Sequence, residues 1–265
     1  FLFPVLDTTR KDKEMYTVTE GIVLKQTKIS GGRRMILIFT KKYGKISAGT
    51  SLNEKGKSKS ALLLRPFTHG KYELQKSGEH FYINGGETIA SHYRIGEDLD
   101  KYLSASYIME YTEKLLPEET QAPPLFELLV SFLDLMEKRT KGYDTLMLSY
   151  LLKALRFSGC EPALDACVHC GKRSGLSRFN IIDGGVVCED CKSIEMDKER
   201  LRYDVEFDIV GILKYLMESP LISFERLALQ EDKVVLLKKI IKEYSSYHLE
   251  ICRLKSEDFM DSSQK

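Results

Sequence analysis

Four of the six cysteines form two C-x-x-C pairs, and their spacing constrains the fold more than any other feature of the chain. Cys167 and Cys170 make the first pair, and Cys188 and Cys191 make the second, in the pattern C-x2-C-x17-C-x2-C. Two thiolates at this spacing reach one metal ion from a tight turn, and a second turn completes the tetrahedral shell that a structural Zn²⁺ prefers. We predict one structural zinc ion in a finger that spans about residues 165–195.

The stretch between the two pairs favours a β-hairpin. Strand-like residues 177–182 and 186–187 flank the turn-forming sequence Asp183-Gly184-Gly185. Such a hairpin would carry the second pair back to the first. A shell of four thiolates leaves no open coordination position, so the ion is expected to be structural and not catalytic.

Other uses of the cysteines are less favoured. One is a disulfide clip, and another is a thioredoxin-like site, which needs a single C-x-x-C that opens a helix. His169, inside the first pair, could replace a cysteine ligand, although a solvated side chain is the simpler interpretation. Cys160 and Cys252 lack a partner at a useful spacing and are expected to be small buried residues.

The formal net charge of +1 hides a division of the chain. Residues 1–95 hold 17 Lys and Arg against 8 Asp and Glu, a net charge of +9, whereas residues 96–265 hold 23 against 31, a net charge of −8. Such an asymmetry predicts two modules with different partners. The basic module suits nucleic acid, and the acidic module is better suited to protein partners.

The basic module has the pattern of a small β-domain. Short strand-like runs are separated by glycine-bearing turns, and a Gly85-Gly86 break precedes the last run. The runs lie at residues 17–24, 35–40, 45–48, 69–74, 81–83 and 88–90. We predict a five-stranded OB-type β-barrel over residues 15–94, because closure removes exposed sheet edges. Residues 1–14 are expected to be an upstream extension or a cloning remnant outside this fold.

Residues 95–265 have the pattern of an all-α domain that carries the zinc finger as an insert. Apolar residues recur at helical spacing, and Pro117, Gly142 and Gly159 punctuate the pattern. Helices are expected at about residues 97–116, 125–139, 145–157, 205–218 and 232–255. The last is expected to bury the stripe Val235, Leu236, Ile240, Tyr244, Tyr247 and Ile251. The fold class predicted for the whole chain is therefore α+β multidomain.

The barrel's strands and loops carry the candidate DNA-binding residues. They are Lys25, Arg33, Arg34, Lys41, Lys42, Lys45, Lys55, Lys57, Lys59 and Arg65. The interleaved aromatic residues are Tyr43, Phe67, Tyr72, Phe81 and Tyr82. Basic side chains that follow a phosphate backbone, with aromatic rings that stack on bases, are what single-strand binding needs. The alternative is a solvated lysine-rich face over a barrel whose core takes most of the aromatic rings.

No catalytic residue is expected. The motifs G-x-G-x-x-G, G-x-S-x-G and H-E-x-x-H do not occur, and the five histidines are scattered without a partner pattern. No apolar run approaches the roughly 18 residues that span a bilayer, and no signal peptide is apparent, so no membrane partner is expected. A cytoplasmic, nucleoid-associated location is the expectation.

Several segments, in their order along the chain, resemble the bacterial recombination mediator family RecO. They are residues 19–24, TEGIVL; 39–48, FTKKYGKISA; 65–70, RPFTHG; 97–101, EDLDK; and 167–171, CVHCG. The resemblance runs from about Thr17 to the C-terminal helix. Two departures are the 14 residues before Met15 and the loop Ser30–Arg34, which lacks the acidic residue common in the family.

The resemblance implies an OB-fold N-terminal domain and a helical domain with a zinc-binding insert. It also implies a DNA repair protein of the RecF-type homologous recombination pathway that binds single- and double-stranded DNA and anneals complementary strands. The implied partners are RecR and single-strand binding protein, and indirectly RecA, which the protein helps to load. Two other classes stay open: a zinc-ribbon transcription or translation factor, and a metal-dependent nucleic-acid-processing enzyme.

Overall fold

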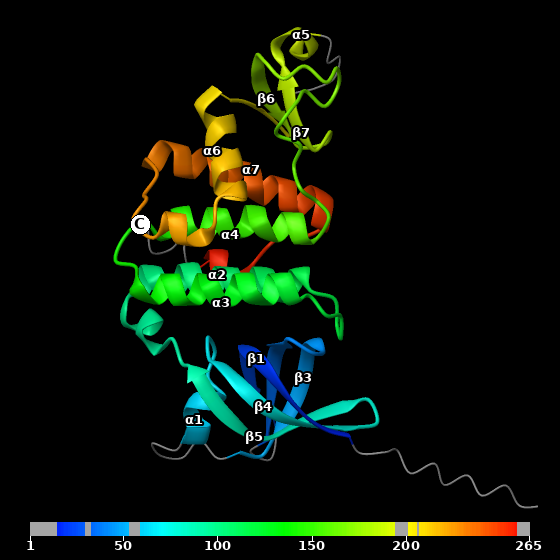
Figure 1. Cartoon of the computed structure of the whole chain (residues 1–265), viewed down its shortest axis with the longest axis vertical. Helices are drawn as coiled ribbons and strands as arrows, with labels where there is room; N and C mark the ends of the chain where they lie inside the picture. Colours follow the sequence, from blue (N-terminus) through cyan, green and yellow to red (C-terminus); the bar gives the residue numbers. More distant parts are fainter. Residues whose placement is uncertain (1–14, 30–32, 53–58, 194–200, 206, 259–265) are drawn as a thin grey trace, which may run out of the picture. The chain divides into compact units, whose positions relative to one another are not determined.

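The computed structural model describes residues 15–29, 33–52, 59–193, 201–205 and 207–258. The chain forms two compact units that meet in the sequence between Ser91 and His92 (Figure 1). We describe each unit by itself.

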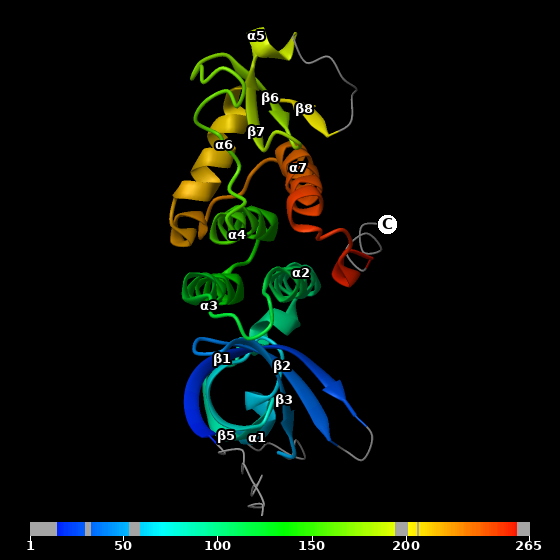
Figure 2. The same ribbon diagram turned by 90° about the vertical axis from the view of Figure 1, so that its right-hand side faces the viewer.

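The first unit is a five-stranded β-barrel with one short helix. Its elements are β1 (Met15–Lys28), β2 (Arg34–Thr40), β3 (Gly44–Thr50), α1 (Lys59–Leu63), β4 (His69–Ser77) and β5 (His80–Ala90). The strands close in the order β1-β2-β3-β5-β4, with β4 pairing back to β1 (Figure 2). Only two parallel residue pairs join β3 to β5, so few backbone hydrogen bonds close the barrel between these two strands. This is the partly open barrel of an OB fold, and the predicted fold class is confirmed.

Strand β1 serves two neighbours because it is long and bent. Its first half pairs with β4, and its second half pairs with β2. The register shifts between Val23 and Lys25, which is a β-bulge, and bulges bend a strand and increase its twist. At Gly21 a Cβ atom would lie 2.7 Å from Cδ1 of Ile38, so glycine lets the bend pass close to the core.

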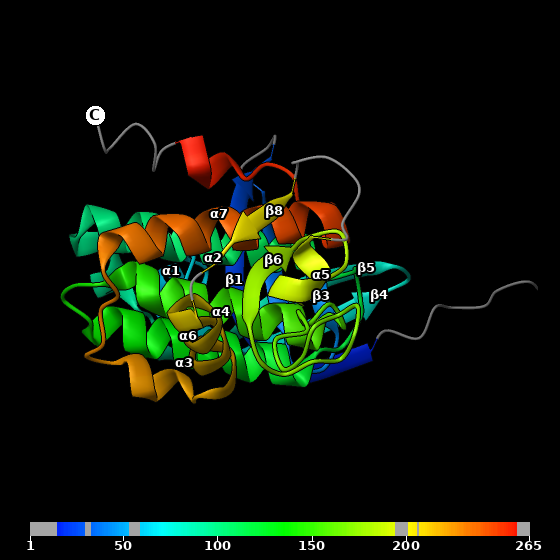
Figure 3. The same ribbon diagram turned by 90° about the horizontal axis from the view of Figure 1, so that it is seen from above.

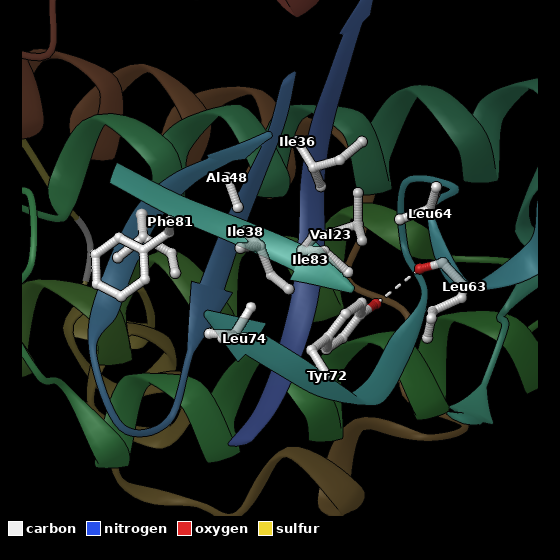
Figure 4. Close-up of a cluster of buried hydrophobic side chains, with 11 residues drawn as sticks. Val23, Ile36, Ile38, Ala48, Leu63, Leu64, Tyr72, Leu74, Phe81 and Ile83 are labelled. Atoms are coloured by element: carbon white, nitrogen blue, oxygen red, sulfur yellow. Dashed lines mark hydrogen bonds between the residues drawn. The ribbon is translucent and has the colours of Figure 1, made fainter. Parts of the chain in front are cut away.

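The barrel encloses a cluster of buried apolar side chains (Figure 4). Inward positions on every strand and on α1 contribute Val23, Ile36, Ile38, Ile46, Ala48, Leu63, Leu64, Tyr72, Leu74, Phe81 and Ile83. Tyr72 is fully buried, and its hydroxyl donates a hydrogen bond of 2.8 Å to the Leu63 carbonyl at the end of α1. Burial raises the pKa of Tyr72, so this hydroxyl stays protonated and ties α1 to the sheet.

The Gly85-Gly86 sequence does not interrupt the last strand, contrary to the prediction. Strand β5 continues from His80 to Ala90, and its register with β4 shifts near Asn84. At Gly86 the φ angle is 151°, and a Cβ atom would collide with the Lys71 carbonyl oxygen. These glycines therefore allow a bulge and a close backbone approach within one strand.

The second unit is helical, with a three-stranded sheet inserted. Its elements are η2 (Tyr93–Glu97), α2 (Leu99–Leu115), α3 (Pro123–Lys138), α4 (Tyr143–Phe157), β6 (Leu176–Asn180), β7 (Gly185–Cys188), α5 (Glu189–Lys192), β8 (Arg202–Asp204), α6 (Phe207–Glu218), η3 (Leu221–Phe224) and α7 (Glu231–Leu249). Helix α4 is the most buried and packs against α2, α3, α6 and α7. Figures 1 and 3 show α4 running between α3 and α7.

The last helix differs from the prediction in its end and in its buried face. It stops at Leu249, where Glu250 adopts a left-handed conformation with φ 58°, and Ile251 is buried outside the helix. Val235 and Tyr247 are exposed, and the buried face is Val234, Leu237, Ile240, Ile241, Tyr244 and Ser245. Apolar residues stand side by side at 234–237, so the spacing alone did not decide which pair faces the core.

Among the residues that the structure describes, no helix has both the length and the apolar character needed to cross a membrane.

Candidate metal centre and nucleic-acid surface

The structure brings the four paired cysteines together. Their Sγ atoms all lie within 4.8 Å of one another. Cys167, Cys188 and Cys191 are buried, and Cys170 is exposed. This is the arrangement that the C-x2-C-x17-C-x2-C spacing predicts.

The first pair sits in a tight turn closed by backbone hydrogen bonds. The Gly171 N–H donates to the Cys167 carbonyl at 2.9 Å, and the Cys167 N–H donates to the Lys172 carbonyl at 2.8 Å. Gly171 has a φ of 75°, which a residue with a side chain rarely adopts. The turn thereby directs both thiols of the pair to the same side.

A β-hairpin delivers the second pair, as predicted. Strands β6 and β7 are antiparallel, with Leu176 opposite Cys188 and Asn180 opposite Gly185. Cys188 ends β7, and Cys191 lies one helical turn later in α5. Gly185 is essential here, because a Cβ atom would collide with the carbonyl oxygen of Ala163.

The geometry and the acid–base chemistry of the four thiols fit one tetrahedral metal ion. Thiolates about 2.3 Å from a zinc ion at tetrahedral angles lie roughly 3.8 Å apart, and the Cys170 and Cys188 Sγ atoms are 3.6 Å apart. Burial raises the pKa of the Cys167 thiol, but backbone N–H groups outweigh it and lower the pKa to about 6. Hydrogen bonding to the thiol of Cys170 raises the pKa of Cys191. A bound cation favours the thiolate form of its cysteine ligands.

The other sulfur and imidazole candidates lie elsewhere. His169 points to Asp183, with Nε2 and Oδ2 2.8 Å apart, so it pairs with a carboxylate and stands outside the cysteine cluster. Cys160 is half-buried and Cys252 is exposed, so the expectation that both are buried is wrong for Cys252. Cys252 lies two residues after Glu250, whose left-handed conformation ends α7.

The finger is larger than its cysteine spacing indicates. Strand β8 adds to β6 as a third antiparallel strand, so the sheet extends to Asp204, beyond the predicted limit near residue 195. The His248 ring on α7 hydrogen-bonds the Ile181 carbonyl at 2.7 Å, and Phe179 meets the Tyr244 ring edge-on at 5.8 Å. Lys214 on α6 pairs with Asp165 at 2.7 Å. The finger therefore rests on α6 and α7 through specific contacts.

The structure distributes the predicted DNA-binding residues over several parts of the barrel. Lys25 is exposed on β1, Arg33 and Arg34 lie at the start of β2, Lys41 and Lys42 lie in the turn after β2, and Lys45 lies on β3. Arg65 is exposed after α1. Lys55 and Lys57 lie outside the described residues, and Lys59 opens α1, with its side chain outside the description.

These basic residues do not form one continuous cluster. With a rise of about 3.4 Å per residue, the seven residues of β2 separate its two ends by roughly 20 Å. Arg34 and Lys41 are therefore at opposite ends of the strand. Lys42 also has a local role, because its Nζ donates to Thr17 Oγ1 at 2.9 Å.

Most of the barrel's aromatic rings are core residues, as the alternative interpretation held. Phe67, Tyr72 and Phe81 are buried, and Tyr43 is half-buried against Phe81 with ring centroids 5.3 Å apart. Tyr82 is the exception among these candidates, with 43% of its surface exposed, and Tyr16 on β1 is 67% exposed. The alternation of side chains along a strand indicates this outward position, because the apolar neighbours Phe81 and Ile83 point inward.

A groove of about 360 Å³ lies on the helical unit between α2, α4 and α7. Its apolar floor includes Met147, Leu151 and Val234. Lysines rim it, and two of them pair with carboxylates: Lys238 with Asp144 at 2.7 Å, and Lys242 with Glu257 at 2.6 Å.

Comparison with known proteins gives a consistent family. Residues 15–92 match the family model described as Recombination protein O N terminal, and residues 96–258 match Recombination protein O C terminal. DNA repair protein RecO of Thermoanaerobacter sp. is 33% identical over 246 residues, covering 93% of this chain and 97% of that protein. DNA repair protein RecO of Caldanaerobacter subterraneus subsp. tengcongensis is 32% identical over 241 residues, covering 91% and 96%. The Bacillus subtilis protein of the same name is 27% identical over 256 residues, covering 94% and 96%.

Proposed function

This chain belongs to the RecO family of DNA repair proteins, and we propose that it is a non-catalytic recombination mediator. It binds single- and double-stranded DNA, anneals complementary strands and, with RecR, helps to load RecA on strands coated by single-strand binding protein. The observation that carries the DNA-binding part is an OB-type barrel within residues 1–95, whose net charge is +9. Such barrels present a strand face and loops to oligonucleotides.

The mechanism is electrostatic. Two DNA strands repel each other, and a basic surface lowers that repulsion by replacing the counterions condensed on the phosphates. A protein that holds both strands also raises their effective concentration for pairing. No bond is made or broken, so neither step needs a general acid, a general base or a nucleotide. The lysines and arginines of the barrel supply the charge, and the acidic helical unit is left for protein partners.

We propose that the four cysteines hold a single structural zinc ion. Four thiolates suit zinc or iron by coordination chemistry, and the hairpin between two C-x-x-C turns is typical of zinc fingers. The bound ion supplies folding free energy and no open coordination position. Elemental analysis of the purified full chain tests this. One equivalent of zinc is expected, whereas iron, or four free thiols without metal, would overturn the assignment.

The groove on the helical unit is our candidate for a partner contact. An apolar floor with lysines at its rim suits a short partner segment that combines large apolar side chains with carboxylates. Single-strand binding protein and RecR, the expected partners, are the first candidates. Val235→Lys, at an exposed position that lines the groove, should weaken binding of the cognate partner at least tenfold and leave DNA binding unchanged. Equal loss of both would point to misfolding, and unchanged partner binding would exclude the groove.

Strand annealing without ATP tests the proposal as a whole. Labelled complementary oligonucleotides are mixed with the full chain, with and without Mg²⁺, and products are separated on a denaturing and a native gel. The proposal predicts faster duplex formation in both conditions and intact strands. Mg²⁺-dependent cleavage would favour a nucleic-acid-processing enzyme. Binding to one defined sequence, without annealing, would favour a zinc-ribbon factor.

Charge reversal then locates the surface. Because β2 separates its ends, the doubles Arg33→Glu/Arg34→Glu and Lys41→Glu/Lys42→Glu test two sites separately. Lys114→Glu/Lys141→Glu, at exposed positions in the acidic unit, is the matched control for the change in charge. We expect slower annealing from at least one barrel double and parental annealing from the control. Parental annealing by both barrel doubles would remove the barrel face from the mechanism.

A further inference from the structure

We propose that the outer face of β2, β3 and β5 binds unstacked bases of single-stranded nucleic acid, with Tyr82 as the stacking platform. This rests on the proposed DNA-binding function and assigns to it a form of DNA, a face of the barrel and a residue. The basic residues of the sequence analysis do not specify any of these, because phosphate contacts carry no preference for exposed bases.

The strand register places Tyr82 in a row of outward residues. Met35 on β2 pairs with Gly49 on β3, and Gly49 pairs with Tyr82 on β5. The next residues along, Ile36, Ala48 and Phe81, all belong to the buried core (Figure 4). Because side chains alternate between the two faces of a strand, the row of Met35, Gly49 and Tyr82 lies on the outside.

This row has the shape of a shallow base-binding surface. Tyr82 is 43% exposed and Met35 is 37% exposed, although both are large and apolar side chains are favoured inside. Gly49 between them has no side chain, and a Cβ atom there would lie 3.4 Å from Cδ1 of Tyr82. The ring therefore packs at the glycine and leaves part of its surface free for an incoming base.

Cations lie on both sides of this row along the strands. Lys25 pairs with Leu37, and Leu37 pairs with Ser47, which makes the next outward row, about 7 Å farther along the strands. Lys45, two residues before Ser47 on β3, occupies the next outward position in the same direction. Beyond the Tyr82 row, at the other end of the face, the exposed Arg33 stands two residues before Met35. A single strand crossing this face would meet positive charge for its phosphates on both sides of the aromatic platform.

A duplex is a poor ligand for this row, because its bases are stacked on one another and its exterior is phosphate and sugar. A protein segment is also less favoured, since the exposed apolar surface is small and has cations and polar residues around it. On β4, Gln75 pairs with Tyr82 and accepts a 2.9 Å hydrogen bond from Asn84, and the row continues to the exposed Tyr16 on β1, which also pairs with Gln75. Tyr82 is thus expected to matter for single strands, whereas the cations matter for both forms of DNA.

The absence of tryptophan from the chain allows a direct test. Tyr82→Trp makes the platform the only indole in the protein, and stacking of a base on an indole quenches its fluorescence. Titration of the full chain with a poly-dT oligonucleotide should quench this fluorescence and saturate at the same concentration as fluorescence anisotropy of the labelled oligonucleotide. A duplex of the same length should bind without the quenching.

Ile89→Trp is the matched control. Ile89 lies on the same strand, is 49% exposed and is seven residues from Tyr82, roughly 24 Å away along the strand. Its indole should bind the same oligonucleotide without quenching. Equal quenching at both positions, or no quenching at position 82 while anisotropy reports binding, would overturn the proposal.

The affinities of the parent and of Tyr82 variants for single-stranded and duplex DNA distinguish the stacking proposal from the proposed DNA-binding function. Tyr82→Ala should weaken single-strand binding by about 5- to 100-fold, with duplex binding within twofold of the parent, and Tyr82→Phe should restore single-strand binding. A parent that binds neither form of DNA would contradict the proposed function. A parent that binds both, with Tyr82→Ala unchanged, would contradict only the platform. A parallel loss of duplex binding and thermal stability in Tyr82→Ala would also count against it, because the role would then be structural.

Discussion

The barrel and the finger are both small β structures, and they are stabilised in different ways. The barrel packs a core cluster of eleven buried residues, Tyr72 among them, from all five strands and the end of α1. The finger has three short strands, and where its two turns meet, the side chains that converge are four cysteines. A barrel can fold on apolar burial, whereas a finger of this kind depends on the free energy of an ion.

The two regions also differ in how their charges are arranged. In the finger, cations are matched by nearby carboxylates: Lys172 pairs with Asp190 at 2.7 Å, and Arg178 pairs with Asp204 at 2.9 Å. In the barrel, exposed cations such as Lys25 on β1 and Lys41 and Lys42 after β2 belong to the first 95 residues, which hold few acids. The difference fits the proposal that the finger has a structural role and that the barrel binds DNA.

Metal removal should give the largest effect and should affect only one of the two regions. Chelation, or Cys188→Ser at a buried cysteine of the cluster, should unfold the finger. The reason is that the binding free energy of a structural zinc ion, about 10–16 kcal/mol in zinc-finger peptides, is also folding free energy. Limited proteolysis should then cut within residues 165–204, while the barrel stays protected. Cys252→Ser, at the exposed cysteine, is the control and should behave as the parent. Simultaneous loss of barrel protection would show that the two regions are not independent.

Removal of the Tyr72 hydroxyl from the barrel core should have an effect of intermediate size on the free energy of unfolding. Tyr72→Phe keeps the ring and leaves the buried Leu63 carbonyl without its 2.8 Å hydrogen bond, which should lower the free energy of unfolding by about 1–3 kcal/mol. Denaturant unfolding of the barrel measures the change. Tyr82→Phe, at the exposed tyrosine, should stay within about 0.5 kcal/mol of the parent. Similar values for the two variants would contradict the account of the barrel core.

The ion pairs of the finger should give the smallest effect, and it should depend on pH. Hydrogen bonds from Arg178 and then Lys192 lower the pKa of Asp204, which holds β8 to β6 and α5. A depressed carboxyl pKa stabilises the fold above the unfolded pKa of about 4, and the contribution is lost as the pH falls through the lower folded value. Asp204→Asn should therefore weaken hydrogen-exchange protection of β8 at pH 7 by under about 1 kcal/mol, with a smaller difference in acid. An equal difference at every pH would exclude the charge as the cause.

The local spacing of the cysteines predicted the metal centre. The third strand of the finger and the arrangement of the barrel's surface residues depend on long-range strand register, which the sequence pattern does not contain. The C-x-x-C turns and the hairpin between them are local, so the sequence was enough to bring the four cysteines together. Strand β8 was missed because its three residues pair with β6 across more than twenty positions of sequence. The separation of Arg34 from Lys41 and the outward position of Tyr82 both follow from barrel register, which a list of basic and aromatic residues does not contain.

The salt dependence of DNA binding tests the division of labour between barrel and finger most directly. The logarithm of the affinity for a poly-dT oligonucleotide falls with the logarithm of the salt concentration, with a slope of about −0.7 per phosphate contact. The account predicts that Lys25→Ala/Arg33→Ala/Arg34→Ala makes the slope shallower by roughly 1–2, and that Lys172→Ala/Arg173→Ala/Arg178→Ala leaves it unchanged. A shallower slope from the finger variant, with a parental slope from the barrel variant, would contradict it.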